Sequence, residues 1–317
     1  MATSVAPAAE TKPAKQGFQM SESVAHLGTM IFAGSILVIT LLIVFVLINK
    51  AQLAISKFGF GFFTGTNWDP VAEQFGAWPF VYGTLVTSFL ALAIAVPLGV
   101  GAAIFLAELA PPRISNILTF LVELLAAVPS VIYGLLAIFT VVPLMRDYIE
   151  PFLKATLGFL PFFTGQIYGV GYLTAALVLA IMSFPFIISI SREALIDVPR
   201  DQREAALALG ATHWESTYQI VVPNASFGIV GAVFLGLARA LGETMAVTMV
   251  IGNSPEVHQS LFAAGYTIPA VIANEFSEAG NVHAGALVLL ALVLFLITMV
   301  INGVARFLLA MNARRSR

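Results

Sequence analysis

The stretch Glu204-Ala205-Ala206-Leu207-Ala208-Leu209-Gly210 is followed, after nine intervening residues, by Ile220-Val221-Val222-Pro223. It is the longest polar island in the second half of an otherwise apolar chain, and long apolar runs precede and follow it. Polar segments between apolar runs connect membrane helices on the watery side of the bilayer. The stretch therefore predicts a structured loop between two membrane spans.

Composition supports a membrane protein independently. Of 317 residues, 59% are hydrophobic and only 10% are charged, with a mean hydropathy of +0.94. A soluble domain carries about 25% charged residues. The 25 glycines suit helices that pack closely in lipid. With no cysteine in the chain, disulfides, thiolate metal sites and cysteine nucleophiles are excluded. We expect an all-α membrane protein.

Six apolar runs are long enough to cross the hydrocarbon core, which takes about 20 residues. The runs are 27–48, 82–109, 117–144, 170–190, 225–251 and 284–309. They predict a six-helix transmembrane domain over 26–310, which contains the polar loop at 191–222. Residues 1–25 are expected to be a flexible polar tail, and 311–317 a basic tail.

The distribution of lysine and arginine predicts the orientation, because these residues gather in cytoplasmic loops. With six spans, both tails lie on one side. That side holds Lys12, Lys15, Arg113, Arg192, Arg200, Arg203, Arg306, Arg314, Arg315 and Arg317. The opposite side holds Lys50, Lys57, Arg146 and Lys154. We expect the tails and the loop 191–222 to be cytoplasmic, and 50–79 and 252–282 to lie outside.

Helix signals are clear within the loop. Asp197 can cap a short helix that has Pro199 at its second position. Gly210 stands where a left-handed residue ends a helix. Thr212 and Glu215 match a capping box that begins a second helix. That helix is expected to run toward Pro223, where the fifth span begins.

The residue types of this loop suit docking into a groove on another protein. Three alanines leave one surface of the short helix without bulky side chains, and charged side chains can form a polar rim around that surface. The alanines are Ala205, Ala206 and Ala208, and the charged residues are Arg200, Arg203 and Glu204. The alternative is an ordinary solvated loop with capped helices.

A second candidate site lies inside the fifth span. Arg239 and Glu243 are four residues apart and so are expected on one helical face. Arg239 lies roughly 24 Å along the helix from Pro223. A charge at that depth costs at least about 2.5–3.5 kcal/mol and should face protein or water. The two side chains are either a structural pair or the lining of an anion path. Glu108 and Glu123, near the cytoplasmic ends of their spans, are expected to be structural.

Two further features each allow two interpretations. Pro97, Pro129 and Pro185 fall inside spans, where proline is tolerated; a packing kink is favoured over a gating hinge. The loop 50–79 is rich in phenylalanine, glycine and tryptophan. It is either an aromatic belt at the membrane surface, which composition favours, or a docking surface for a solute-binding protein.

No enzyme chemistry is indicated. A phosphate-binding G-x-x-x-x-G-K-[ST] loop is excluded, since no lysine follows a glycine anywhere in the chain. The four histidines, His26, His213, His258 and His283, are too scattered to form a metal site. We expect no catalytic residue, no metal, no cofactor and no nucleic-acid binding.

Four blocks of sequence together resemble the PstC type of permease in phosphate ABC transporters. They are Tyr82 to Ser88, Glu123 to Gly134, the EAA loop quoted above, and Arg239-Ala240-Leu241-Gly242-Glu243-Thr244-Met245-Ala246-Val247. The likeness covers about 28–310. The loop spacing resembles ABC importers in general, and the Arg239 block resembles the phosphate branch. Val222 departs from the leucine that is common in the family.

The resemblance implies a type I ABC importer permease fold in the inner membrane of a bacterium. It implies a heterodimer with a PstA-like permease, a PstB-like ATPase dimer that binds ATP, and a PstS-like phosphate-binding protein outside. Glu204, Ala205, Ala206 and Gly210 would then contact the ATPase, and Arg239 and Glu243 would line the substrate path. From the residues alone, the substrate is only an oxyanion. A permease for another oxyanion such as sulfate, or a secondary anion transporter, remains an alternative.

Overall fold

The computed structural model describes residues 16–315, and these are almost entirely helical. The chain divides into two compact units, 1–49 and 50–317. Helix α1 (Gln16–Phe58) begins in the first unit and ends in the second. Large apolar side chains are exposed along it from Val24 to Ile48, which fits a helix in contact with lipid. The expected tail 1–25 overlaps this helix from Gln16 onward, while 1–15 lie outside the described residues.

The prediction of six spans is confirmed. Among the described residues, six helices are long and apolar enough to cross a membrane. They are Val24–Phe58, Trp78–Leu109, Ser130–Leu157, Tyr172–Ile196, His213–Gly242 and Asn281–Phe307. The first, second, fourth and sixth lie close to the expected runs. The third and fifth differ, because helix breaks interrupt the apolar sequence.

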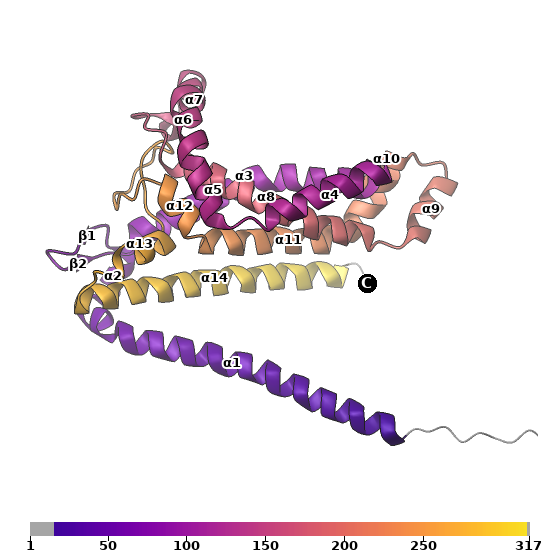
Figure 1. The fold of residues 1–317 in the computed structure, drawn as a ribbon, viewed down its shortest axis with the longest axis horizontal. Coiled ribbons are helices and arrows are strands. Elements are labelled where there is room, and N and C mark those ends of the chain that lie inside the picture. Colours follow the sequence, from indigo (N-terminus) through magenta and orange to yellow (C-terminus); the bar gives the residue numbers. More distant parts are fainter. Residues whose placement is uncertain (1–15, 316–317) are drawn as a thin grey trace, which may run out of the picture. The chain divides into compact units, whose positions relative to one another are not determined.

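Figure 1 shows the elements of the second unit. In chain order they are α2 (Gly61–Thr64), β1 (Trp68–Asp69), β2 (Gln74–Phe75), α3 (Trp78–Ile104), α4 (Pro112–Ala126), α5 (Ser130–Leu136), α6 (Val142–Leu144), α7 (Glu150–Leu157), α8 (Tyr172–Ile196), α9 (Arg200–Ala208), α10 (His213–Ser216), α11 (Val222–Gly242), α12 (Met245–Val250), α13 (Ile268–Glu275) and α14 (Asn281–Arg315). Short π-helical turns extend α3 to Leu109 and link α5 to α6, α6 to α7, and α10 to α11.

The expected third span, 117–144, is wrong. Its apolar sequence is split between α4, which ends at Ala126, and α5, which begins at Ser130. Pro129 lies between them in an extended conformation, with ψ of 140°. Proline lacks an N–H and disfavours a helical residue before it, so the helix stops here rather than kinking. The helix here that is long and apolar enough to cross is Ser130–Leu157, and it includes Arg146 and Lys154, which were expected in a loop.

Helix α8 is the centre of the bundle. In its apolar core segment 67% of the residues are buried, against 33% or less in the other five spans. It packs between α3 and α11, and its Ile187 is wholly buried. A Cβ added at Gly99 of α3 or Gly236 of α11 would lie 2.9 or 3.1 Å from the Ile187 side chain. Small residues thus let two backbones approach the central helix closely.

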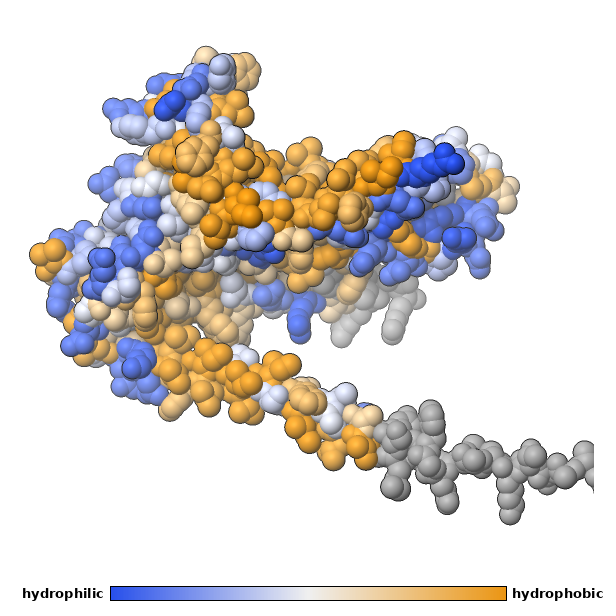
Figure 2. Space-filling model, in the orientation of Figure 1, coloured by the Kyte–Doolittle hydropathy of each residue, from blue (hydrophilic) through white to orange (hydrophobic). Residues whose placement is uncertain are grey.

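The flank of the second unit is apolar, and its two ends are polar. Figure 2 shows hydrophobic surface along the helices, with hydrophilic residues around α9 and α10 and around the opposite loops. In Figure 1, α9 and α10 lie at one end, and α13 with the β1–β2 hairpin lies at the other. The loop 191–222 and the segments 50–79 and 252–282 therefore lie at opposite ends, as expected.

The loop 50–79 folds as a packed cap rather than as an open aromatic belt. Phe62, Trp68 and Phe75 are buried, whereas Phe60 is almost fully exposed. The Trp68 indole Nε1 donates a hydrogen bond of 2.9 Å to Glu275, and His283 pairs with the same carboxylate oxygen at 2.9 Å. These contacts join the hairpin to α13 and α14. The sequence pattern could not distinguish an interfacial aromatic from one buried in this cluster.

Candidate functional site

The first candidate site is α9 with the turn that follows it. One face of α9 is turned inward: Ala206 is buried and Arg203 is partly buried. Glu204 and Ala205 are exposed on the other side, together with Ala208. The structure thus places Glu204 and Ala205 on a surface open to a partner. Ala206, expected in the same surface, instead fixes the helix to its own bundle.

Gly210 ends α9 in the expected left-handed conformation, with φ of +91°. The Gly210 N–H donates to the Leu207 carbonyl at 3.0 Å, and the Ala211 N–H donates to the Ala206 carbonyl at 3.1 Å. This pair of bonds is the Schellman motif, which satisfies the last carbonyls of a helix. A glycine is favoured here because side chains disfavour positive φ.

The capping box of the next helix is confirmed. Thr212 Oγ1 accepts from the Glu215 N–H at 3.3 Å, and the Glu215 carboxylate accepts from the Thr212 N–H at 2.8 Å. The helix then continues through a π-helical turn into α11 without a break. The expected start of the fifth span at Pro223 is therefore wrong, because the spanning helix begins at His213. Pro223 lies in the first turn of α11, where its missing N–H is tolerated.

The expected cap at Asp197 is also wrong. Asp197 follows the last residue of α8, and Pro199 rather than Asp197 precedes α9. No side-chain hydrogen bond caps α9. Local sequence could not decide between the end of one helix and the start of the next, because Asp197 stands between both.

Exposed apolar side chains on this loop were not singled out from the sequence. Leu209 is 90% exposed at the end of α9, and Trp214 and Tyr218 are also exposed. Large exposed apolar residues beside a polar rim are typical of protein interfaces. The available signal was the presence of leucine and aromatic residues inside a polar island.

The second candidate site surrounds Arg239 on α11. Its side chain is exposed, and its guanidinium carbon lies 5.6 Å from the centre of the Phe186 ring on α8. Tyr133 of α5 packs against the apolar cluster that contains Leu237 and Ala240 of α11. Among the described residues no carboxylate forms an ion pair with Arg239. Its hydrogen-bond donors are thus available to an anion.

Glu243 does not share a helical face with Arg239. Helix α11 ends at Gly242, and Glu243 has an extended backbone with ψ of 128°. Its carboxylate instead accepts a hydrogen bond of 3.3 Å from the Ala246 N–H at the start of α12. The i, i+4 pairing expected from the sequence is wrong because the helix stops between the two residues.

Two interrupted helices meet near this site. α5 follows the break at Pro129, α12 follows the break at Glu243, and the two helices pack together. A Cβ on Gly134 of α5 would lie 2.9 Å from the Ala246 Cα and 2.6 Å from the Met249 sulfur of α12. Discontinuous membrane helices of this kind form substrate sites in transporters. The hydropathy of the sequence could not reveal either break.

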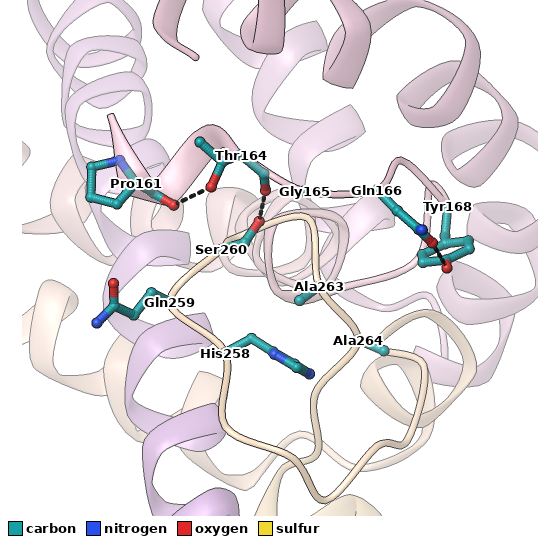
Figure 3. Close-up of a pocket in the computed structure, with 10 residues that line it drawn as sticks. All are labelled: Pro161, Thr164, Gly165, Gln166, Tyr168, His258, Gln259, Ser260, Ala263 and Ala264. Carbon is teal, nitrogen blue, oxygen red and sulfur yellow. Dashed lines mark hydrogen bonds between the residues drawn. The ribbon is translucent and has the colours of Figure 1, made fainter. Parts of the chain in front are cut away.

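A cavity of about 520 Å³ opens at the end opposite α9. Two segments line it, 161–168 before α8 and 258–264 between α12 and α13. Figure 3 shows His258 and Gln259 beside it, with Ser260 bonded to the Thr164 carbonyl. Lys154 donates to the Gly165 carbonyl at 2.7 Å and so steadies the first segment. Polar and apolar residues both line the cavity, and no metal-binding cluster occurs among the described residues.

Solved structures define the class of protein. The chain is similar to one in a bacterial alginate ABC transporter in complex with an alginate pentasaccharide-bound periplasmic protein, with a TM-score of 0.59 and 15% identity over 92% of this chain and 98% of that one. It is also similar to a chain of the MetNI methionine ABC transporter in an inward-facing conformation, with a TM-score of 0.51 and 19% identity over 75% and 94%. The fold is that of a type I ABC importer permease.

Sequence comparison specifies the family. Residues 95–317 match the family described as binding-protein-dependent transport system inner membrane component, and the chain belongs to this family. It is 44% identical to the phosphate transport system permease protein PstC of Mesorhizobium japonicum, over 92% of this chain and 91% of that protein. It is 45% identical to the protein of the same name from Haemophilus influenzae, over 91% and 93%. The chain is a multi-pass membrane protein of an ABC transport system.

Proposed function

We propose that this chain is the permease subunit of an ATP-driven phosphate importer and forms half of the translocation pathway. The observation that carries the proposal is the exposed Arg239 beside two interrupted helices, in a chain 44% identical to a phosphate permease. A guanidinium matches the geometry of phosphate oxygens and stays charged at any physiological pH. Phosphate would meet this group on its way through the bilayer.

Energy would come from a separate ATPase that docks on α9. The exposed Glu204 and Ala205, with the turn at Gly210, form the surface for this contact, and Ala206 holds the helix in place from behind. Leu209 adds an apolar anchor that is 90% exposed in the isolated chain. The ATP is bound by the partner, and this chain supplies no cofactor.

The complex would contain a PstA-like permease, a PstB-like ATPase dimer and a PstS-like phosphate-binding protein. The cavity between 161–168 and 258–264 lies at the end opposite α9 and would receive the binding protein. With α9 facing the ATPase, both tails lie in the cytoplasm of a bacterium and the cavity faces outward. The distribution of lysine and arginine supports the same orientation.

Reconstitution tests the function. The chain is co-purified with its partner permease and ATPase, placed in proteoliposomes with the binding protein, and assayed for uptake of labelled phosphate and sulfate. We expect phosphate uptake that requires ATP. Uptake of sulfate instead would identify another oxyanion permease. Uptake by the chain without any ATPase, driven by an ion gradient, would identify a secondary transporter.

A further inference from the structure

Arg203 of α9, expected from the sequence to be a rim charge, lies inside the structure. Only 19% of its side chain is exposed, and only 11% of that of its partner Glu108. The Arg203 Nη2 donates to Glu108 Oε1 at 2.8 Å, and Nε donates to Oε2 at 3.3 Å. The pair is therefore a two-point contact between α9 and the cytoplasmic end of α3.

The same guanidinium also binds the end of α8. Nη2 donates to the Leu195 carbonyl at 2.7 Å, and Nη1 donates to the Val198 carbonyl. The Leu195 carbonyl lies at the end of α8, where it also accepts a backbone hydrogen bond of 3.4 Å from the Val198 N–H, and the Val198 carbonyl lies in the connection that follows. One side chain thus ties together α3, α8 and α9.

The local backbone conformation places the Glu108 side chain beside Arg203. α3 ends in a π-helical turn, Phe105–Leu109, which contains Glu108. The Leu106 carbonyl of the same turn accepts a hydrogen bond of 2.8 Å from Ser115 of α4. Leu195 and Val198 are buried in the same apolar cluster as Ala103 and Leu106. The guanidinium thus lies against a packed part of the bundle.

Resting on the proposed function, we propose that Arg203 and Glu108 are positioning residues that couple the ATPase contact to the spans. A helix held only by apolar contacts could slide when a partner pulls on it. A planar guanidinium with bonds to three segments resists such sliding, because displacement breaks several charge-assisted bonds together. Movement of α9 is thereby transmitted to α3 and α8.

The test separates coupling from folding. Removing one partner leaves a buried charge uncompensated and destabilises the protein, whereas replacing both with apolar residues is often tolerated. The variant is therefore Arg203→Met with Glu108→Leu. The control is Arg113→Met, which removes an exposed arginine at the start of α4. Arg203→Lys keeps the charge but not the planar fork.

Phosphate uptake and ATP hydrolysis are measured per assembled complex in proteoliposomes. We expect the double variant to assemble and hydrolyse ATP, with uptake per ATP at least about fivefold lower, the lower end of typical coupling between sites. Arg203→Lys should be intermediate, and Arg113→Met should match the wild type. A wild-type ratio in the assembled double variant would overturn the proposal. If even the wild-type complex shows no ATP-driven uptake, the proposed function itself fails.

A second readout does not depend on transport. The chain has no cysteine, so spin labels at Phe105→Cys and Gln202→Cys report the distance from α3 to α9 in the assembled complex. We expect a narrow distribution with the pair intact and a broad one in the double variant. An equally narrow distribution in both would show that apolar packing alone holds α9, and would also overturn the proposal. If the double variant fails to assemble, Arg203→Lys provides the same comparison.

Discussion

At the scale of single residues, each candidate site contains an arginine, and the two arginines have different surroundings. Arg203 is committed to four hydrogen bonds within the described protein, and it holds one element in place. Arg239 is exposed, and its guanidinium lies over the face of the Phe186 ring. A largely buried guanidinium with four hydrogen bonds is suited to holding elements together, whereas an exposed one is suited to binding an anion.

Arg239→Gln is expected to leave the complex assembled and to lower phosphate uptake by about tenfold or more. A hydrogen bond to a charged group contributes roughly 1.5–3 kcal/mol, and glutamine lacks the charge. Arg239→Lys should also be impaired, because an ammonium lacks the planar fork. Glu243→Gln should be milder, since an amide oxygen can still accept the Ala246 N–H. Uptake of labelled phosphate per assembled complex measures all three.

Normal uptake by assembled Arg239→Gln would show that this residue is not on the phosphate path. Loss of the protein from the membrane in that variant would instead indicate a structural role through its contact with Phe186. Arg239→Lys would then assemble, because an ammonium preserves a cation–π contact.

Gly210→Leu is expected to weaken ATPase association and to lower uptake. A left-handed conformation costs an ordinary residue about 1–2 kcal/mol, and a Cβ at Gly210 meets nothing within 4 Å, so backbone strain is the only cost. Gly210→Asn should be milder, because asparagine visits this conformation more readily. Pull-down of the ATPase measures the contact. Equal association by all three proteins would show that the turn is merely solvated.

At the scale of elements, helix interruptions organise the pathway. The breaks at Pro129 and Glu243 allow α5 and α12 to approach each other in the region of Arg239. Gly134 makes that approach possible, because its missing side chain leaves room for Ala246 and Met249. Continuous helices over the same apolar runs would not bring these segments together.

Gly134→Ala is expected to destabilise the protein by about 1–3 kcal/mol, the usual cost of overpacking. The added Cβ would lie 2.9 Å from the Ala246 backbone, so the two helices must separate. Thermal unfolding in detergent measures the effect. The control is Gly101→Ala in α3, where a Cβ meets nothing within 4 Å. Equal unfolding temperatures for the two variants would show that α5 and α12 are not tightly packed.

At the scale of the whole molecule, the two ends of the second unit are built from different elements. α9 and α10 occupy one end of the second unit, and the hairpin, α13 and the cavity at 161–168 and 258–264 occupy the other. The apolar flank between them, shown in Figure 2, fits a surface in contact with lipid. Because different elements lie at the two ends, a label placed at each end can test the orientation of the protein in the membrane.

Thr66→Cys is expected to be labelled by a membrane-impermeant thiol reagent in intact cells. Thr66 is exposed in the segment 50–79, and the natural chain has no cysteine. Asn116→Cys, an exposed position on α4 near the opposite end, should be labelled only after the cytoplasmic face is opened. Gel detection of the bound reagent measures both. The reverse pattern would place α9 outside and contradict ATPase docking.

The membrane class, the number of spans and the turn at Gly210 could all be predicted from the sequence. Apolar content sets the membrane class and the number of spans, because an apolar segment of sufficient length partitions into lipid whatever its neighbours are. The turn and the capping box depend on bonds between residues a few positions apart. Such local interactions are present in the chain before any tertiary contact forms.

Only the tertiary structure decided the helix breaks, the central place of α8 and the partner of Arg203. Hydropathy cannot distinguish a continuous span from two helices joined at Pro129, since lipid and the protein interior are both apolar. Glu108 and Arg203 lie far apart in sequence and meet through packing of α3, α8 and α9. The sequence alone determined that six segments are apolar enough to cross the membrane, and long-range packing determined where the third and fifth helices begin and end and which charges are paired.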